Sequence, residues 1–276
     1  MSYSNFVPTF WTEKIMRDNE KLLVLANLCS RDYEGQIRGK GDTVKIIGIG
    51  KVTIKDYTGG TLDSPEKIED TSIFLKIDTA KYFNVGIEDI DKAQATGNVM
   101  DTIMMEGNEG MADAEDTSIG TIMLAEAGES VTCTAAVSKD NARTYLQQAK
   151  TKLRKNGVKN STIICAAVTP EYAEKLEIKQ EEIDTDNSGV LRNGFEGKVS
   201  GIEIYVSNNL PTSSSKDVCF IFTKKRAVTH ANQVTKVKPF EPESGFEEAI
   251  KVLKNWGTKV VRPKELVKFV VTSSYS

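Results

Sequence analysis

The chain holds a single histidine, His230, within the stretch KKRAVTHANQ. Any serine–histidine–aspartate or cysteine–histidine arrangement would have to use this residue as its base. A lone histidine at the end of a strand-like segment is typical of a structural or solvated side chain, and no CxxC pair accompanies it to hold zinc. The sequence therefore predicts no catalytic residue, no metal site and a protein that is not an enzyme.

Two segments approach ligand-binding motifs without completing them. Gly48 and Gly50 give a GxG pattern, but the third glycine of a dinucleotide-binding loop is missing, and no GxxxxGK[ST] phosphate loop occurs. Residues 184–189 (DTDNSG) match the first half of a calcium loop, which needs a bidentate glutamate to close it. Phe195 stands at that position and Glu196 comes one residue late. A polar loop with an Asx turn is the better interpretation, and no cofactor is expected.

The composition is that of a soluble, folded chain. Its 276 residues suffice for one large domain or two moderate ones, and 39% hydrophobic and 27% charged residues are ordinary for globular proteins. No apolar run is long enough to span a membrane, and the first residues lack the pattern of a secretory signal. Four widely spaced cysteines are expected to be buried free thiols in a reducing cytoplasm: Cys29, Cys133, Cys165 and Cys219.

Charge is unevenly distributed along the chain, whose net charge is −3. Residues 1–127 carry 13 basic and 22 acidic side chains, whereas residues 128–276 carry 23 basic and 17 acidic ones. The two halves should therefore attract each other, within one chain or between copies. The compact basic cluster at 224–226 is explained at least as well by a solvated strand end, so sequence-specific nucleic-acid binding is not expected.

The most informative element is residues 87–127, which contain ten acidic residues, one basic residue and no proline. Apolar and small residues recur at helical spacing and predict one long helix, either continuous or broken near Thr117: Met100, Ile103, Met104, Gly107, Met111, Ala114 and Ile122. Because globular helices average about 11–12 residues, this length suggests a spine that needs neighbours. A surface helix of an ordinary α/β domain is the alternative.

An arm and a hairpin are predicted before this helix. Residues 1–12 carry aromatic side chains that must dock somewhere, on another subunit or on their own domain, and residues 12–30 have a helical pattern. Residues 43–57 and 71–84 alternate like two strands joined by a glycine-rich loop, with a bend expected at the glycines of the first strand. An isolated two-stranded hairpin is marginal in water, so this one should lie on a partner.

An α/β region follows the long helix. Its predicted elements are a helix at 138–155, a buried strand at 161–168, a helix from Pro170 to about Leu176, and strands at 198–206 and 218–229. Residues 245–256 combine strong helix formers with strand-like flanks, so their own composition leaves helix and strand open.

Taken in this order, the elements resemble a major capsid protein of a tailed bacteriophage with the Hong Kong 97-type fold. The resemblance covers nearly the whole chain and is carried by structural segments: GDTVKIIGIGKVTIKDYTGG (41–60), FNVGIEDIDKAQATGN (83–98), GKVSGIEIYVSNNLP (197–211) and WGTKVVRPKELVKF (256–269). It implies an α+β fold with an N-terminal arm, an extended β-hairpin loop, a long spine helix, a peripheral β-sheet and an axial α/β domain.

The same resemblance divides the chain and decides the ambiguous segment. Its divisions are 1–40 for the arm and short helix, 41–86 for the hairpin loop, 87–130 for the spine helix, 131–232 for the axial α/β domain, and 233–276 for the returning strands. Residues 245–256 are then expected to be strand, because the corresponding family segment belongs to the peripheral sheet.

The function implied by this resemblance is that of a self-assembling subunit of the icosahedral or prolate head shell. Copies would form hexamers and pentamers around double-stranded DNA, which they enclose without sequence-specific binding, and no membrane is involved. Separate scaffolding, portal and head-completion proteins are implied partners, and virion assembly is expected in the host bacterial cytoplasm. The acidic spine would repel DNA or pair with a basic neighbour, and spine bending during procapsid maturation is a hypothesis.

Subunit contacts are expected from three places. The residues concerned are Phe6, Phe10 and Trp11 in the arm; Lys51, Tyr57, Leu62, Pro65 and Phe74 in the hairpin; and Asp101, Met104, Gly107 and Met111 in the spine helix. Two alternatives stay open at this point. One is an encapsulin-like compartment shell that encloses protein cargo, and the other is a small-molecule-binding α/β domain.

Overall fold

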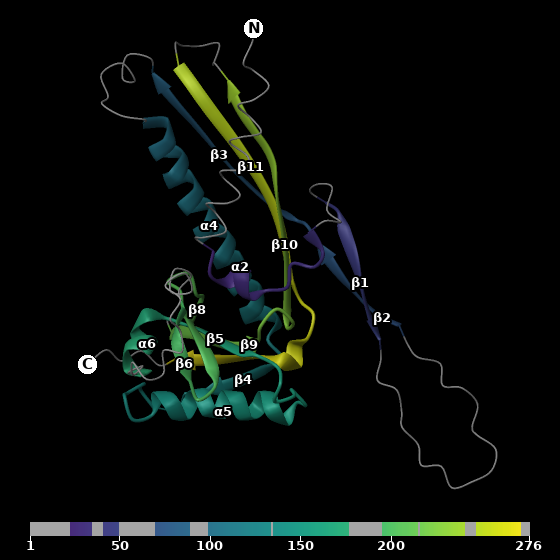
Figure 1. The fold of residues 1–276 in the computed structure, drawn as a ribbon, viewed down its shortest axis with the longest axis vertical. Helices are drawn as coiled ribbons and strands as arrows, with labels where there is room; N and C mark the ends of the chain where they lie inside the picture. Colours follow the sequence, from purple (N-terminus) through teal and green to yellow (C-terminus); the bar gives the residue numbers. More distant parts are fainter. Residues whose placement is uncertain are drawn as a thin grey trace, which may run out of the picture.

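The computed structural model describes residues 23–34, 41–49, 70–88, 99–133, 135–176, 195–214, 216–240 and 247–271. Figure 1 shows an upright arm in which a long helix lies beside long strands, a base built on a second sheet, and a two-stranded hairpin that projects to one side. Several predicted contact residues lie outside the described residues: Phe6, Phe10, Trp11, Lys51, Tyr57, Leu62 and Pro65.

The upright arm contains helix α4 (Val99–Glu126), whose 28 residues pass through Thr117 without a break. At about 1.5 Å per residue the helix is about 42 Å long. Residues 87 and 88, predicted to begin this helix, instead end strand β3 (Thr79–Glu88), because their backbone pairs with β11 (Glu247–Val260). β11 also pairs antiparallel with β10 (Val228–Phe240), which completes a three-stranded sheet.

This sheet confirms that residues 247–256 are strand despite their helix propensity. Long antiparallel pairing with β3 and β10 on either side gives the segment two ladders of backbone hydrogen bonds, which outweigh a local preference of a few tenths of a kcal/mol per residue. Helix α4 packs closely on the sheet at Gly107, where an added Cβ would lie 2.9 Å from the ring of Phe83. Gly110, one turn further on, has open space around it.

The base is a seven-stranded sheet with helices on both faces. Its strands are β4 (Glu129–Thr132), β5 (Ile164–Val168), β6 (Phe195–Val199), β7 (Ile202–Val206), β8 (Thr212–Ser213), β9 (Lys216–Thr223) and β12 (Leu266–Val271). Helices α5 (Ala142–Lys155) and α6 (Pro170–Leu176) share a core with one face, and α2 (Leu25–Leu28) and α4 share a core with the other. A 3-10 turn, η5 (Pro263–Glu265), precedes β12.

The order of elements in the base follows the sequence patterns, but α5 begins at Ala142 rather than at 138, β5 begins at Ile164 rather than at 161, and β4 and β8 were not predicted. Two predicted strands also differ in extent. The predicted strand at 198–206 is a hairpin of β6 and β7, turned at Ser200 and Gly201, which both have positive φ, as a tight type I′ turn requires. The predicted strand at 218–229 is interrupted after Thr223, and the chain then enters β10 in the other sheet. Among the described helices, none combines the length and hydrophobicity needed to cross a membrane.

Three of the expected divisions of the chain fall inside strands. The positions 86, 130 and 232 lie within β3, β4 and β10. The division of the chain into domains at these positions stays a prediction.

The hairpin consists of β1 (Thr43–Ile49) and β2 (Asp70–Lys76), paired antiparallel in a continuous register. Gly48 lies opposite Thr71 without the expected bulge, while Gly50 is outside the described residues. The predicted second strand, 71–84, is two strands, because the chain leaves β1 after Lys76 and pairs with β11 from Thr79 onward.

The hairpin packs on the three-stranded sheet at the end where β1 begins and β2 ends. One face of the hairpin is apolar and packs with Ala231 of β10, and we call this contact the hairpin root: Val44, Ile46, Leu75, Ile77 and Ala231. Gly257 of β11 permits the approach, since an added Cβ there would lie 2.2 Å from the carbonyl oxygen of Lys76. The hairpin is therefore fixed to the body at this root.

Candidate functional site at the spine junction

Polar side chains meet between α4 and the three-stranded sheet, close to the base. His230 and Asn232 lie two residues apart on β10 and so face the same side. We call the whole group the spine junction: Glu115 and Asp116 of α4, His230 and Asn232 of β10, and Lys254 and Thr258 of β11. All except Asn232 are buried, and Glu115 and His230 have no exposed surface.

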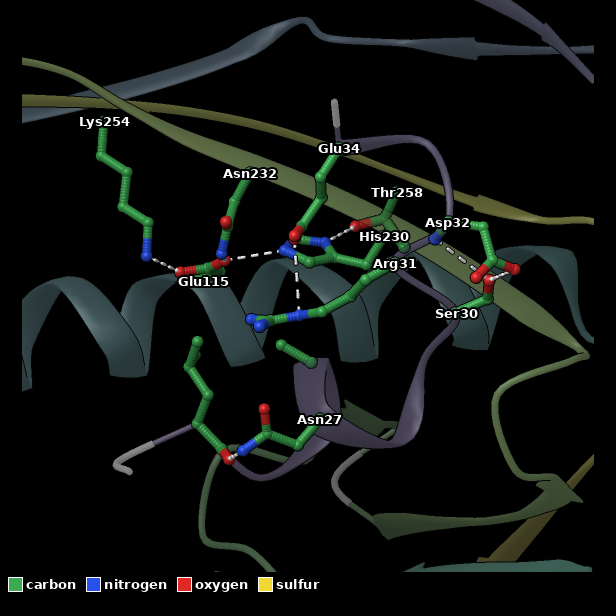
Figure 2. Close-up of polar contacts among 12 residues, drawn as sticks. Asn27, Ser30, Arg31, Asp32, Glu34, Glu115, His230, Asn232, Lys254 and Thr258 are labelled. Carbon is green, nitrogen blue, oxygen red and sulfur yellow. Dashed lines mark hydrogen bonds and ion pairs between the residues drawn. The ribbon is translucent and has the colours of Figure 1, made fainter. Parts of the chain in front are cut away.

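Glu115 is the centre of this group, as Figure 2 shows. Its Oε1 accepts hydrogen bonds from His230 Nε2 at 2.7 Å and from Asn232 Nδ2 at 2.6 Å. Lys254 Nζ pairs with the other carboxylate oxygen. His230 Nδ1 lies 2.9 Å from Thr258 Oγ1. Because an ionised carboxylate only accepts hydrogen bonds, His230 Nε2 is the donor to Glu115.

The surroundings hold Glu115 in its charged form. Burial alone would raise the pKa of this carboxyl, but the hydrogen bonds and charges of His230 and Lys254 outweigh burial and lower its pKa from 4.5 to about 2. Buried ions are costly unless they are paired and hydrogen-bonded. The junction satisfies that condition by collecting donors from two strands around one carboxylate.

Asp116, the next residue, links α4 to the N-terminal segment. Its carboxylate accepts hydrogen bonds from the backbone N–H groups of Val24, Leu25 and Ala26 at 2.8, 3.2 and 3.1 Å. These donors begin helix α2, whose first N–H groups have no partner within the helix. Burial, only partly opposed by these three bonds, raises the pKa of Asp116.

The end of α4 is held to β11 by a further acidic residue. Glu126 accepts a hydrogen bond from the backbone N–H of Val260 at 3.1 Å and pairs with Lys259. The expected attraction between the acidic first half and the basic second half of the chain is thus present within one chain, at Glu115 and at Glu126.

Acid should remove the stabilisation that Glu115 provides. Its folded pKa of about 2 lies below the ordinary value of 4.5, so the stabilisation is complete above about pH 4.5 and is lost as the pH falls toward 2. The difference corresponds to about 3 kcal/mol. The raised pKa of Asp116 acts in the opposite sense and offsets part of this loss. Melting curves of the wild type and Glu115→Gln should therefore converge between pH 5 and pH 2, and a constant difference in Tm would contradict this prediction.

The junction is arranged for stability rather than for a reaction. Its carboxylates are occupied by donors of the same chain, and the neighbouring Cys29 thiol is buried, with its pKa raised by burial. Within the described ranges, no group of three or more His, Cys, Asp or Glu side chains could hold a metal ion. All four cysteines are free and buried, as the sequence predicted.

The predicted contact residues that are described do not belong to the junction. Phe74 lies on the outward face of the hairpin and is 55% exposed. Met104 and Met111 are buried, and Gly107, on the same side of α4, lies beside the ring of Phe83 in the sheet. Asp101 lies in the first turn of α4. Whether these residues contact another subunit stays a prediction.

Sequence reasoning missed Glu115, Asp116, His230 and Lys254 as a group. The sequence predicts a structural or solvated side chain for His230, and the structure shows it as structural and fully buried. A usable signal was present in β10, where His230 and Asn232 occupy alternate positions of one strand face. The acidic partner could not be chosen from ten acidic residues without the fold.

A long spine helix that packs on two sheets and a projecting hairpin define the architecture of this chain. The chain belongs to the phage capsid protein family, whose family model matches residues 70–269. A search of curated proteins finds no significant match.

Solved structures of similar fold support this assignment. A chain from Mycobacterium phage Che8 is 29% identical, with a TM-score of 0.71 and 90% of each chain covered. The capsid of cyanophage P-SCSP1u is 17% identical, with a TM-score of 0.70 over 91% of this chain and 89% of that one. A virus-like particle from Pyrococcus furiosus is 14% identical, with a TM-score of 0.62 over 95% and 98%. The fold is the Hong Kong 97-like capsid fold, and the protein is a structural capsid protein that assembles into a multimeric shell.

Proposed function

We propose that this chain is the major subunit of a tailed-phage head, and that its hairpin contacts a neighbouring copy in the shell. The shell encloses double-stranded DNA without reading its sequence, is assembled in the host bacterial cytoplasm, and is completed by separate scaffolding, portal and head-completion proteins. Membership of a structural capsid family supports a role without catalysis.

The proposed contact between the hairpin and a neighbouring copy rests on one observation, that β1 and β2 pair with each other in a separate sheet. They form a two-stranded sheet of their own, fixed to the body through the hairpin root, and project away from the base (Figure 1). The inward face is covered by the root, whereas Phe74 on the outward face is half exposed. A neighbouring copy would bury this aromatic ring and stabilise a ribbon that is marginal alone.

Replacing Phe74 with serine should reduce shell formation and leave the subunit stable. An exposed side chain contributes little to folding, typically within about 0.5 kcal/mol, so the Tm of the unassembled subunit should stay unchanged. The yield of shells in negative-stain electron microscopy should fall several-fold. Ile163→Ser is a matched control, because Ile163 is also 55% exposed but lies outside the hairpin. Normal shells from the Phe74 variant would remove this face from subunit contact.

Electron microscopy of the purified protein tests the function as a whole. Closed polyhedral shells or capsomers are expected, and a persistent monomer under assembly conditions would contradict the proposal. The structural similarity to a virus-like particle from Pyrococcus furiosus supports one alternative function, that of an encapsulin-like compartment shell. Shells that enclose protein cargo and exclude DNA in the host would favour that alternative.

A further inference from the structure

Helix α5 and the turn after it carry a concentrated positive charge. Residues 139–159 contain seven basic side chains and one acidic side chain. Figure 1 shows α5 along the edge of the base, on the side of its sheet that faces away from α4. We call this group of side chains the basic helix face. Lys150 and Arg154 lie on one flank of the exposed side of α5, Lys152 lies on the other flank, Lys155 lies on the exposed side itself, and Lys159 follows in the turn.

The charges of this face are not neutralised by carboxylates of the described chain. Lys150 Nζ, Lys152 Nζ and Arg154 Nη1 donate to the backbone carbonyls of Ser200, Ser130 and Val158, which carry no net charge. Among ion pairs between described residues, none includes a member of the basic helix face.

The neighbouring cations of this face repel one another, as the pKa of Lys150 indicates. Burial first, and then the positive charge of Arg154, lowers the pKa of Lys150. An incoming anion would relieve that repulsion, because it would neutralise several cations at once.

Helix stability explains only part of this charge. Basic residues in a last turn interact favourably with the helix dipole, which accounts for Lys152, Arg154 and Lys155. It does not account for Lys150, one turn earlier, or for Lys159, which lies beyond the helix end. The positive charges of Lys150 and Lys159 therefore exceed what the helix dipole explains, although Lys150 also holds the Ser200 carbonyl.

The uncharged residues of the exposed side indicate what kind of partner fits. Thr144, Gln147, Gln148 and Thr151 are exposed and polar, and hydroxyl and amide groups beside lysine and arginine are the side chains that contact DNA phosphates. A protein partner would need an apolar centre. Among the described residues, the large exposed hydrophobic side chains lie elsewhere than on α5: Phe74, Tyr82, Met105 and Ile163.

We propose that the basic helix face binds the phosphate backbone of duplex DNA without sequence preference. This inference rests on the proposed function, because it requires the face to meet the enclosed genome. The exposed side of α4 carries Glu106, Glu109 and Asp113 and repels phosphate. Weak anchoring of DNA at α5 would thus coexist with free sliding over the acidic spine.

The test compares full-length wild type with Lys150→Gln/Lys155→Gln/Lys159→Gln for binding a random-sequence duplex, measured by fluorescence anisotropy at several salt concentrations. Each phosphate contact contributes about 0.9 to the slope of log K against log salt. The triple variant should therefore lose a slope of about 2.7 and bind at least about tenfold more weakly at low salt. A control with the same charge change is Lys81→Gln/Lys225→Gln/Lys238→Gln, at exposed sites away from α5.

Several outcomes would overturn the inference. Equal losses in the triple variant and its control would mean that net charge alone matters. Equally tight binding of polyglutamate to the wild type, lost in the triple variant, would indicate an acidic protein partner instead. Electron microscopy and Tm distinguish failure of this inference from failure of the proposed function. Shells that form normally but bind DNA independently of α5 would overturn this inference only. Absence of shells in the wild type would overturn the proposed function.

Discussion

Replacing Glu115 with glutamine should lower the Tm of the subunit by about 10 °C. Three donors, from His230, Asn232 and Lys254, converge on this carboxylate. A glutamine offers one acceptor oxygen and places its own N–H₂ donor against the others. Breaking a buried ion pair by removing one partner costs about 3–5 kcal/mol, and each kcal/mol corresponds to roughly 2–4 °C in a chain of this size class.

The matched control is Glu109→Gln, which makes the same change at an exposed position of the same helix. It should leave the Tm within about 2 °C, because exposed charges contribute little. Lys254→Met alone and together with Glu115→Gln completes a double-mutant cycle. If the two single effects simply add, the pair is not coupled, and the junction is not what holds α4 to the sheet.

Replacing Gly257 with alanine should detach the hairpin from the body. The new Cβ would lie 2.2 Å from the Lys76 carbonyl oxygen and 2.9 Å from Ile77 Cδ1, and the first neighbour is backbone that cannot turn aside. The hairpin root must then open by about 1 Å or more, at a cost of about 1–3 kcal/mol. Hydrogen exchange of the β1 and β2 amides should accelerate at least about tenfold, since 1.4 kcal/mol is a factor of ten, and shells should be lost.

Gly110→Ala provides the comparison, because its added Cβ meets open space on the same upright arm. Alanine favours helix over glycine by about 1 kcal/mol, so this variant should melt at a slightly higher temperature and assemble normally. Wild-type exchange rates in β1 and β2 of the Gly257 variant would show that the hairpin root is not fixed by this close approach.

The spine junction and the hairpin root lie on opposite faces of the same three-stranded sheet. The spine junction holds α4 on one face of the three-stranded sheet, and the hairpin root lies on the other face at Ala231 and Gly257. β10 and β11 therefore connect the spine with the hairpin, as Figure 1 shows. A change in either contact should therefore be transmitted to the other through these strands.

The sequence by itself determined the long helix and the alternating strands of the hairpin, whereas the returning strand followed only from the resemblance to a capsid family. These elements depend on local periodicity and on the order of segments, both of which are visible in one chain. The same patterns identified a capsid-like architecture and the burial of the cysteines.

Only the tertiary structure decided the partners. Alternation at 71–84 is the same whether a strand pairs with β1 or β11, so the exchange after Lys76 left no local mark. An acidic residue on a helix has the same pattern whether it faces water or a sheet, and Glu115 lies 115 and 139 residues from its partners His230 and Lys254. Burial, desolvation and pairing of that carboxylate arise from packing between distant segments, and no local spacing specifies them.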